Sequence, residues 1–244
     1  MLSNKYIINK YLPNFIYHSD EKYKSCKFST YKDKCSELIP HHLYLSKNNF
    51  DIKYGVDNEF QIVSNVFEKS INNIKVTDVI YAIFFPYNGN IGIVNKGEHW
   101  IDIEYITLRF YGSKQDIMNI SNILPDYVFF SEHKRGTWKK YKNLISTDPE
   151  HINVFIAKSS HALYWKPSTF YRYFGFGNDK CNNGIKIPLE NIDICVYDPQ
   201  NVDSLFEYDT LSQFSYINFK EKHCIFHGCD VHYSCLKSCN ICFN

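Results

Sequence analysis

The chain has 244 residues, enough for one large domain or two small ones. Its 27 Lys and Arg against 26 Asp and Glu give a formal net charge of +1, so no overall field attracts nucleic acid, and we expect no nucleic-acid partner. The 20 Tyr and 19 Phe favour sheet over helix, although richness in Asn, Lys, Ile and Tyr also indicates an AT-rich genome.

The amino terminus does not have the pattern of a secretion signal. No run of seven apolar residues follows a basic start, so we expect no signal peptide. The longest strongly apolar run, "VIYAIFF" at residues 79–85, is far shorter than the roughly 20 residues that span a bilayer. We therefore expect no transmembrane segment and a cytoplasmic or virion location.

Taken in chain order, the elements are mostly strands. The first 75 residues predict short strands and loops, with no long amphipathic period. A strand at 76–87, stopped by Pro86, precedes a Gly- and Asn-rich loop at 88–98. Strands are then expected at 101–112, 126–133 and 152–164, a short helix within 113–124, a basic solvent-exposed hairpin at 133–142, and a last extended segment at 184–198.

Polar side chains cluster where these strands meet loops. Alternation along 101–112 places Asp102 and Glu104 on one face, directly before an apolar stripe. His133 ends an aromatic row in 126–133, and His161 follows the apolar part of 152–164. If the three strands are neighbours in one sheet, these groups converge at one mouth of the core.

A converging acid cluster calls for a compensating cation or for water. Burying an unpaired carboxylate costs several kcal/mol, and a divalent ion with oxygen ligands would satisfy Asp102 and Glu104. The imidazole of His99 is compatible with Mg²⁺ or Ca²⁺, with Mn²⁺ and Zn²⁺ as alternatives. Strict alternation puts His99 on the opposite face, so it joins the acids only from a loop or a bulge, which Gly97 makes easier. Ordinary surface ion pairs are the competing interpretation.

A Cys- and His-rich tail begins near residue 221. The spacing C-x-x-C is a good zinc chelate, but a disulfide-stapled tail and free thiols explain the same residues. Spacing alone leaves zinc, disulfides and free thiols open. The tail candidates are Cys224, Cys229, Cys235, Cys239 and Cys242.

Five ordered segments between residues 8 and 180 resemble motifs of the Vps62-like family. They are "KYLPNFIYHSDEKYKSCKF", "FFPYNGN", "GEHWIDIEYITLRF", "VFFSEHKRGTWKKY" and "VFIAKSSHALY". The H-x-x-D-x-E element also resembles the GHRHDWE heptapeptide of the necrosis- and ethylene-inducing-peptide-like proteins. Residues 101 and 103 are Ile here, where the family pattern has Gly and Trp.

The resemblance implies a β-sandwich that holds a divalent cation at one end and engages a lipid headgroup there. The cation ligands it implies in this chain are His99, Asp102 and Glu104, with His133 nearby. Further candidate site residues from the matched motifs are His161, His18 and Glu21.

We therefore predict a mainly β, single-domain β-sandwich at 1–220 with a few short helices, and a Cys/His-rich appendage at 221–244. The leading function is a non-enzymatic, cation-dependent module that binds a lipid headgroup or a glycan. The first alternative is a metal-dependent hydrolase with His133 or His161 as general base. The second is a structural or virion-associated protein held by tail disulfides. A serine triad at Ser131 or Ser160 is not expected, because the chain has no G-x-S-x-G motif.

Overall fold

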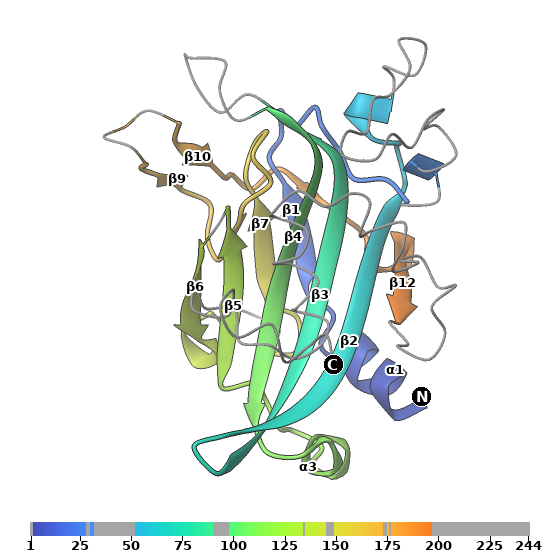
Figure 1. Ribbon diagram of the computed structural model, residues 1–244, viewed down its shortest axis with the longest axis vertical. Coiled ribbons are helices and arrows are strands. Elements are labelled where there is room, and N and C mark those ends of the chain that lie inside the picture. Colours follow the sequence, from blue (N-terminus) through green and yellow to red (C-terminus); the bar gives the residue numbers. More distant parts are fainter. Residues whose placement is uncertain are drawn as a thin grey trace, which may run out of the picture.

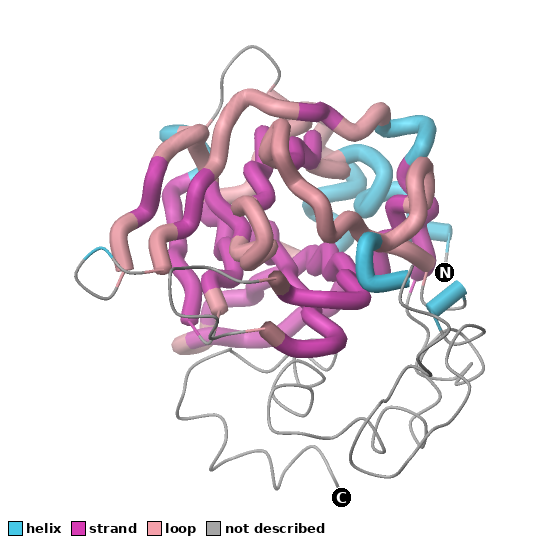
Figure 2. The backbone as a smooth tube through the Cα atoms, turned by 90° about the horizontal axis from the view of Figure 1, so that it is seen from above, coloured by secondary structure: helices cyan, strands magenta, loops and turns pink. Residues whose placement is uncertain are grey.

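The computed structural model describes residues 2–27, 30–31, 52–89, 98–133, 135–144, 149–172, 175 and 177–196. This part of the chain is mainly β, with two sheets, a separate two-stranded hairpin and a few short helices (Figure 1). Figure 2 shows the strands grouped around one interior, with helical segments at the periphery. None of the helices in these ranges is long and apolar enough to span a membrane.

The larger sheet has six strands in the order β12-β2-β3-β4-β5-β6. Neighbouring strands are antiparallel, except that β12 runs parallel to β2. Asn72 and Asn73 form the two-residue turn between β2 and β3, and both have positive φ, as a type I′ hairpin turn requires. The strands are β2 (Phe60–Ile71), β3 (Ile74–Asn88), β4 (His99–Tyr111), β5 (Tyr127–Glu132), β6 (Arg135–Lys140) and β12 (Ile192–Val196).

The smaller sheet has the order β11-β1-β7-β8, and its two central strands are parallel. Its members are β1 (Asn14–Tyr17), β7 (Asn153–Ile156), β8 (Leu163–Tyr164) and β11 (Ile185–Lys186). The separate hairpin pairs β9 (Thr169–Phe170) with β10 (Asp179–Lys180). The 3₁₀ turns of the described chain include η2 (Tyr141–Asn143) and η4 (Leu189–Asn191).

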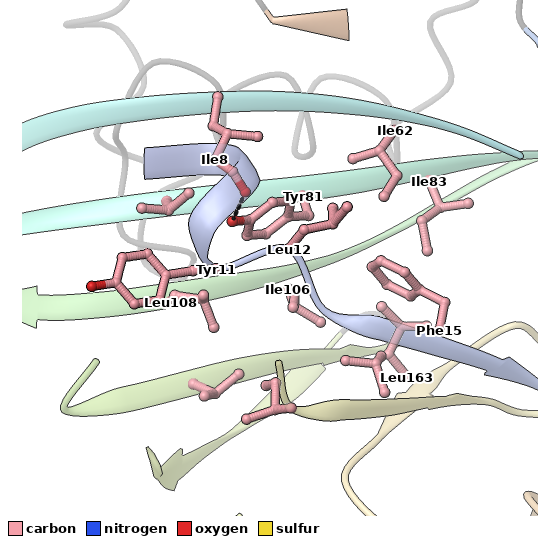
Figure 3. Close-up of a cluster of buried hydrophobic side chains, with 14 of the residues drawn as sticks. Ile8, Tyr11, Leu12, Phe15, Ile62, Tyr81, Ile83, Ile106, Leu108 and Leu163 are labelled. Carbon is pink, nitrogen blue, oxygen red and sulfur yellow. Dashed lines mark hydrogen bonds between the residues drawn. The ribbon is translucent and has the colours of Figure 1, made fainter. Parts of the chain in front are cut away.

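The core lies between the two sheets and is closed at one end by α1 (Leu2–Lys10). Figure 3 shows the apolar side chains of β3, β4 and α1 meeting those of β1 and β8. The hydroxyl of Tyr81 donates to the carbonyl of Ile8 at 2.9 Å, which satisfies the one polar atom of a fully buried ring. The second helix, α3 (Lys114–Asn119), is capped by Ser113 and Asp116 in a reciprocal capping box.

Most predicted elements are present, and three predictions are wrong in detail. Strands β4 and β5 and helix α3 lie where expected. Pro86 does not stop its strand, because β3 continues to Asn88. The predicted strand at 152–164 is a tight hairpin, β7–β8, with its turn at 157–162. The first 75 residues contain a helix, α1, and the 12-residue strand β2 where only short strands and loops were expected.

Candidate functional site

The candidate site lies at the end of the sandwich where β4 begins and where β1, β5 and β7 end (upper end in Figure 1). The strands that carry Asp102, Glu104 and His133 and the turn that carries His161 reach this end, where His161 contacts Asp102 and His133 contacts Asp179. The geometry differs from the expectation in one respect, because β7 belongs to the smaller sheet and faces β4 and β5 across the core. Residues from both sheets consequently surround the site.

Asp102 and Glu104 lie almost completely buried at this end, 6 % and 1 % exposed. They stand opposite Phe85 and Ile83 of β3, so they share the face of β4 that continues into the core. The Ser131 hydroxyl donates a short hydrogen bond to Glu104 Oε2. That hydroxyl also accepts from the backbone N–H of residue 105 at 2.8 Å, beyond the last paired residues of β4 and β5. At this point the Ser131 side chain, rather than the backbone of β5, accepts the hydrogen bond from β4, so the backbone pairing of the two strands ends next to Glu104.

His161 is fully buried and forms an ion pair with Asp102. Its ring stacks on Phe85, with centroids 3.9 Å apart and planes 1° from parallel. Nδ1 lies 3.3 Å from Asp102 Oδ2, and Nε2 lies 2.8 Å from the carbonyl oxygen of Tyr23. Both partners are hydrogen-bond acceptors, so these contacts favour the imidazolium form, in which both ring nitrogens carry protons.

The surroundings of His161 favour this charged form. Burial alone would lower the pKa of His161, but the hydrogen bond to Asp102, the charge of Glu21 and the carbonyl of Tyr23 together raise it. His161 therefore supplies a positive charge beside Asp102 inside the core end.

Glu21 ties the segment after β1 to the β7–β8 turn. Its Oε1 accepts the backbone N–H groups of Lys22 and Tyr23 at 2.9 and 2.8 Å, and its Oε2 accepts that of Ser159 at 2.6 Å. His18 lies outside this arrangement, since its Nδ1 accepts from the backbone N–H of residue 20 in an exposed turn. Partial burial lowers the pKa of His18. Glu21 is thus a positioning residue, and His18 stays at the rim.

Another buried carboxylate, that of Asp179 in β10, contacts four side chains. It accepts hydrogen bonds from Ser160 Oγ at 2.6 Å and from Tyr164 Oη at 2.7 Å. His133 Nε2 lies 2.8 Å away, and a guanidinium nitrogen of Arg172 lies 3.6 Å away and also contacts His133. Burial would raise the pKa of Asp179, but His133 and the two hydroxyls hold it below its usual value. His133 thus pairs with Asp179 in this structure.

Glu132, at the end of β5, adds a carboxylate to the surroundings of Asp179. Its Oε1 is buried and has no hydrogen-bond partner among the described residues. Burial raises the pKa of Glu132, and the nearby charge of Asp179 acts in the same direction. A buried acceptor oxygen without a donor is uncommon in proteins and indicates a place for a ligand hydrogen, a water or an ion.

Backbone strain is concentrated at this end. Six non-glycine residues in the described ranges have positive φ, and three are asparagines, which tolerate it well. The other three are His133 (φ 59°), Ser159 (φ 65°) and His161 (φ 56°). Each costs of order 1–3 kcal/mol, and such residues tend to cluster at functional sites. Hydrogen bonds hold this conformation: the Ser159 N–H donates to Glu21, the Ser159 carbonyl accepts from the Gly89 N–H, and the His161 N–H donates to the Ala157 carbonyl.

The predicted cation site stays a prediction. Within the described ranges, no three His, Cys, Asp or Glu side chains form a group that could hold a metal ion. The register from His99–Asn88 to Glu104–Ile83 runs without a bulge, so the backbone distortion that would turn residue 99 toward the acids is absent from this stretch of β4. The His99 side chain and the five tail cysteines lie outside what the structure describes.

Sequence reasoning missed several residues of the site. Asp179 and Arg172 lie in or beside a segment, "FGFGND", that reads as a simple turn. Tyr23 contributes a backbone carbonyl, which leaves no signature in a sequence. Tyr164 and Ser160 were predicted only as part of a continuous strand. The only indication in the sequence that these residues belong to the site was the presence of hydroxyl and acidic residues close to His161.

Comparison with known proteins identifies the family. The model of the family described as vacuolar protein sorting-associated protein 62, Vps62, matches residues 47–214. The chain belongs to the Vps62 family. The matched range includes β4, β5, the β7–β8 turn and Asp179, whereas Glu21 precedes it. No curated protein matches this Vps62-family chain.

Among solved structures, the Vps62-family chain is similar to necrosis- and ethylene-inducing-type proteins, as the H-x-x-D-x-E element predicts. NLPPya in complex with mannosamine has 9 % sequence identity and a TM-score of 0.49, over 88 % of this chain and 82 % of that one. NLPPya in complex with glucosamine has 9 % identity and a TM-score of 0.47, over 86 % and 79 %. Necrosis and ethylene inducing protein 2 from the causal agent of witches' broom disease of cocoa has 12 % identity and a TM-score of 0.43, over 87 % and 80 %.

Proposed function

We propose that this protein is a binding module that takes a polar ligand, a lipid headgroup or a glycan, at the acidic end of the sandwich with the help of a divalent cation. The observation that carries the proposal is the pair Asp102 and Glu104, two almost completely buried carboxylates on one face of β4. Buried acids lose their hydration and need compensation by charge or by hydrogen-bond donors. A ligand or ion that brings both would be held strongly here.

The surrounding groups support binding at this end. The buried Oε1 of Glu132 has no donor in the described ranges, and the strained backbone at His133, Ser159 and His161 is held in place by specific hydrogen bonds. Such a prearranged end loses little conformational entropy when a ligand binds. The His99 side chain and residues 90–97, which lie outside what the structure describes, adjoin the acids in sequence and are the candidates for completing a cation site.

Binding of a cation would be linked to the proton on His161. When its ring is protonated, His161 supplies one positive charge beside Asp102, and its surroundings raise its pKa. A divalent ion that takes Asp102 as a ligand competes with that proton, so its affinity should rise with pH. This linkage separates a cation at Asp102 from one bound elsewhere.

A serine hydrolase is not supported by the described residues. Ser131 donates its hydroxyl to Glu104, and Ser160 donates its hydroxyl to Asp179. Neither serine is hydrogen-bonded to a histidine within these ranges, as an activated nucleophile would be. A metal-dependent hydrolase with His133 or His161 as general base is the alternative to the binding role.

The test is calorimetric titration of Ca²⁺ and Mg²⁺ into the full chain at pH 6 and pH 8. We expect one ion per chain, tighter binding at pH 8, and loss of binding in Asp102→Asn and Glu104→Gln. The matched control is Asp57→Asn, since the Asp57 side chain is 79 % exposed and should not matter. A headgroup-vesicle and glycan panel with and without EDTA then identifies the ligand. Absence of any ion at millimolar concentration at both pH values would overturn cation dependence.

A further inference from the structure

At the same end of the molecule, the ammonium group of a lysine lies over two tyrosine rings, and a third tyrosine stacks on one of them. The Lys53 Nζ lies 4.1 Å from the ring centroid of Tyr87 and 5.7 Å from that of Tyr23. Tyr23 stacks on Tyr54, with centroids 5.8 Å apart and planes 8° from parallel, and lies 5.2 Å from Tyr87. We call Tyr23, Tyr54 and Tyr87 the tyrosine cluster. It adjoins the acidic end, because the carbonyl of Tyr23 accepts from His161.

Backbone contacts hold these rings in position. The Lys24 N–H donates to the carbonyl of Tyr54 at 3.1 Å, which joins the segment that carries Tyr23 to the one that carries Tyr54. The Tyr23 ring packs so closely on Gly89 that an added Cβ would lie 2.2 Å from a ring carbon. Only glycine at position 89 permits this approach. The rings are therefore placed by the fold rather than by Lys53.

A carboxylate completes the arrangement. The hydroxyl of Tyr87 donates to Glu98 Oε2 at 2.7 Å. Burial and this hydrogen bond raise the pKa of Tyr87, so its ring stays neutral and its hydroxyl stays a donor. Aromatic faces attract cations through the ring quadrupole, and a neighbouring carboxylate adds direct charge attraction. These are the groups that recognise an organic cation.

Lys53 has the properties of a replaceable occupant. It is only partly buried, and Tyr54 is 52 % exposed, so the cluster opens to solvent. A lysine ammonium is strongly hydrated and sits on a flexible stem, so holding it over the rings costs side-chain entropy. A methylated ammonium is more weakly hydrated and loses less on leaving water, and aromatic rings are its usual protein partners.

We propose that the tyrosine cluster is a binding site for a methylated ammonium group, which Lys53 fills when no ligand is present. The site needs no metal, so it is independent of the cation-dependent binding proposed above. The ligand group could come from a small soluble amine or from a lipid headgroup, and the two sources share the same quaternary nitrogen. The tyrosine cluster and the acidic end would then hold two parts of one ligand or two separate ligands.

The test is titration of tetramethylammonium chloride into the full chain in buffer with EDTA, followed by NMR or tyrosine fluorescence. We expect saturable binding that weakens by roughly 2- to 30-fold in Tyr54→Ala, because this change removes the exposed ring that stacks on Tyr23; the range corresponds to one cation–π contact. Lys53→Ala should bind more tightly, because the internal competitor is gone. Lys22→Ala, at an exposed neighbouring lysine, is the matched control and should leave binding unchanged.

Two further arms distinguish the source of the ammonium group. Soluble phosphocholine and phosphatidylcholine vesicles are compared, with phosphatidylglycerol vesicles as the control for charge alone. Binding of phosphocholine alone indicates a small ligand, and binding of the vesicles indicates a headgroup. Failure of both the wild-type chain and Lys53→Ala to bind tetramethylammonium would overturn the proposal, as would equal affinity of Tyr54→Ala with its fold intact by circular dichroism.

Discussion

Replacement of His161 by phenylalanine isolates the polar role of this buried ring. Phenylalanine retains a flat ring that can stack on Phe85, and its backbone would have to adopt the same positive φ as His161 does. It loses both hydrogen bonds, to Asp102 at 3.3 Å and to the carbonyl of Tyr23 at 2.8 Å. Breaking a buried ion pair costs about 3–5 kcal/mol, and a buried acceptor left alone costs about 1–3 kcal/mol. Because the Asp102 contact is long, we expect a loss of about 3 kcal/mol.

The loss should depend on pH in a defined direction. The pKa of His161 is raised in the folded protein, so its contribution to the free energy of unfolding is complete below the unfolded-state value of about 6.5. It declines as the pH rises through the folded-state pKa. The difference between wild type and His161→Phe should therefore be largest near pH 6 and smaller near pH 9.

The assay is urea unfolding followed by tryptophan fluorescence at pH 6 and pH 9, under reducing conditions. His18→Phe is the matched control, because the same chemical change at the rim removes only a local turn contact. It should cost less than about 1 kcal/mol. The reasoning would be refuted if His161→Phe cost no more than His18→Phe at pH 6, or if its cost grew with pH.

Two other substitutions test the residues that hold the site in its conformation. Asp179→Asn should lower the free energy of unfolding by about 3–5 kcal/mol at pH 7. Because the pKa of Asp179 is depressed in the folded protein, this loss should become smaller as the pH falls below about 4. A loss that stays constant between pH 3 and pH 7 would contradict this. Gly55→Ala puts a Cβ 2.2 Å from a backbone oxygen at a φ of 72° and should lower the free energy of unfolding by about 2–5 kcal/mol. Gly175 also has a positive φ, but no atom lies within 4 Å of an added Cβ, so Gly175→Ala should lower it by only about 1–2 kcal/mol. Equal melting temperatures would exclude this difference.

The sequence predicts β3, β4 and β5 of the large sheet because these strands carry a clear apolar or alternating pattern. Alternation in β4 placed Asp102 and Glu104 on the core-facing side, where both prove to be buried. The helix α1 was missed because "LSNKYIINK" is weakly amphipathic and contains the strand-favouring run Tyr6, Ile7 and Ile8. It is helical because Ile7 and Ile8 are fully buried in the core, and such tertiary contacts override local preference.

Which site residues contact each other could not be predicted from the sequence, for a different reason. The turn that places His161 against Asp102 needs positive φ at Ser159 and at His161, and neither residue type announces it as glycine or asparagine would. If that turn is not foreseen, the alternation of side chains along a single strand at 152–164 places residue 161 on an extended strand. The partnership of His133 with Asp179 depends on the β9–β10 hairpin, whose two-residue strands are too short to predict.

The parallel pairing of β1 with β7 has a consequence for how the chain reaches this structure. Phe15 pairs with Val154, so β1 waits for about 140 further residues before its partner exists. At translation rates of about 5–20 residues per second, that interval lasts roughly 7–28 s, during which the apolar "NFIY" strand has unpaired edges. Closing so long a loop is also slow in refolding, because its entropy is lost before the contacts form. During synthesis, β1 is therefore the segment most in need of a chaperone.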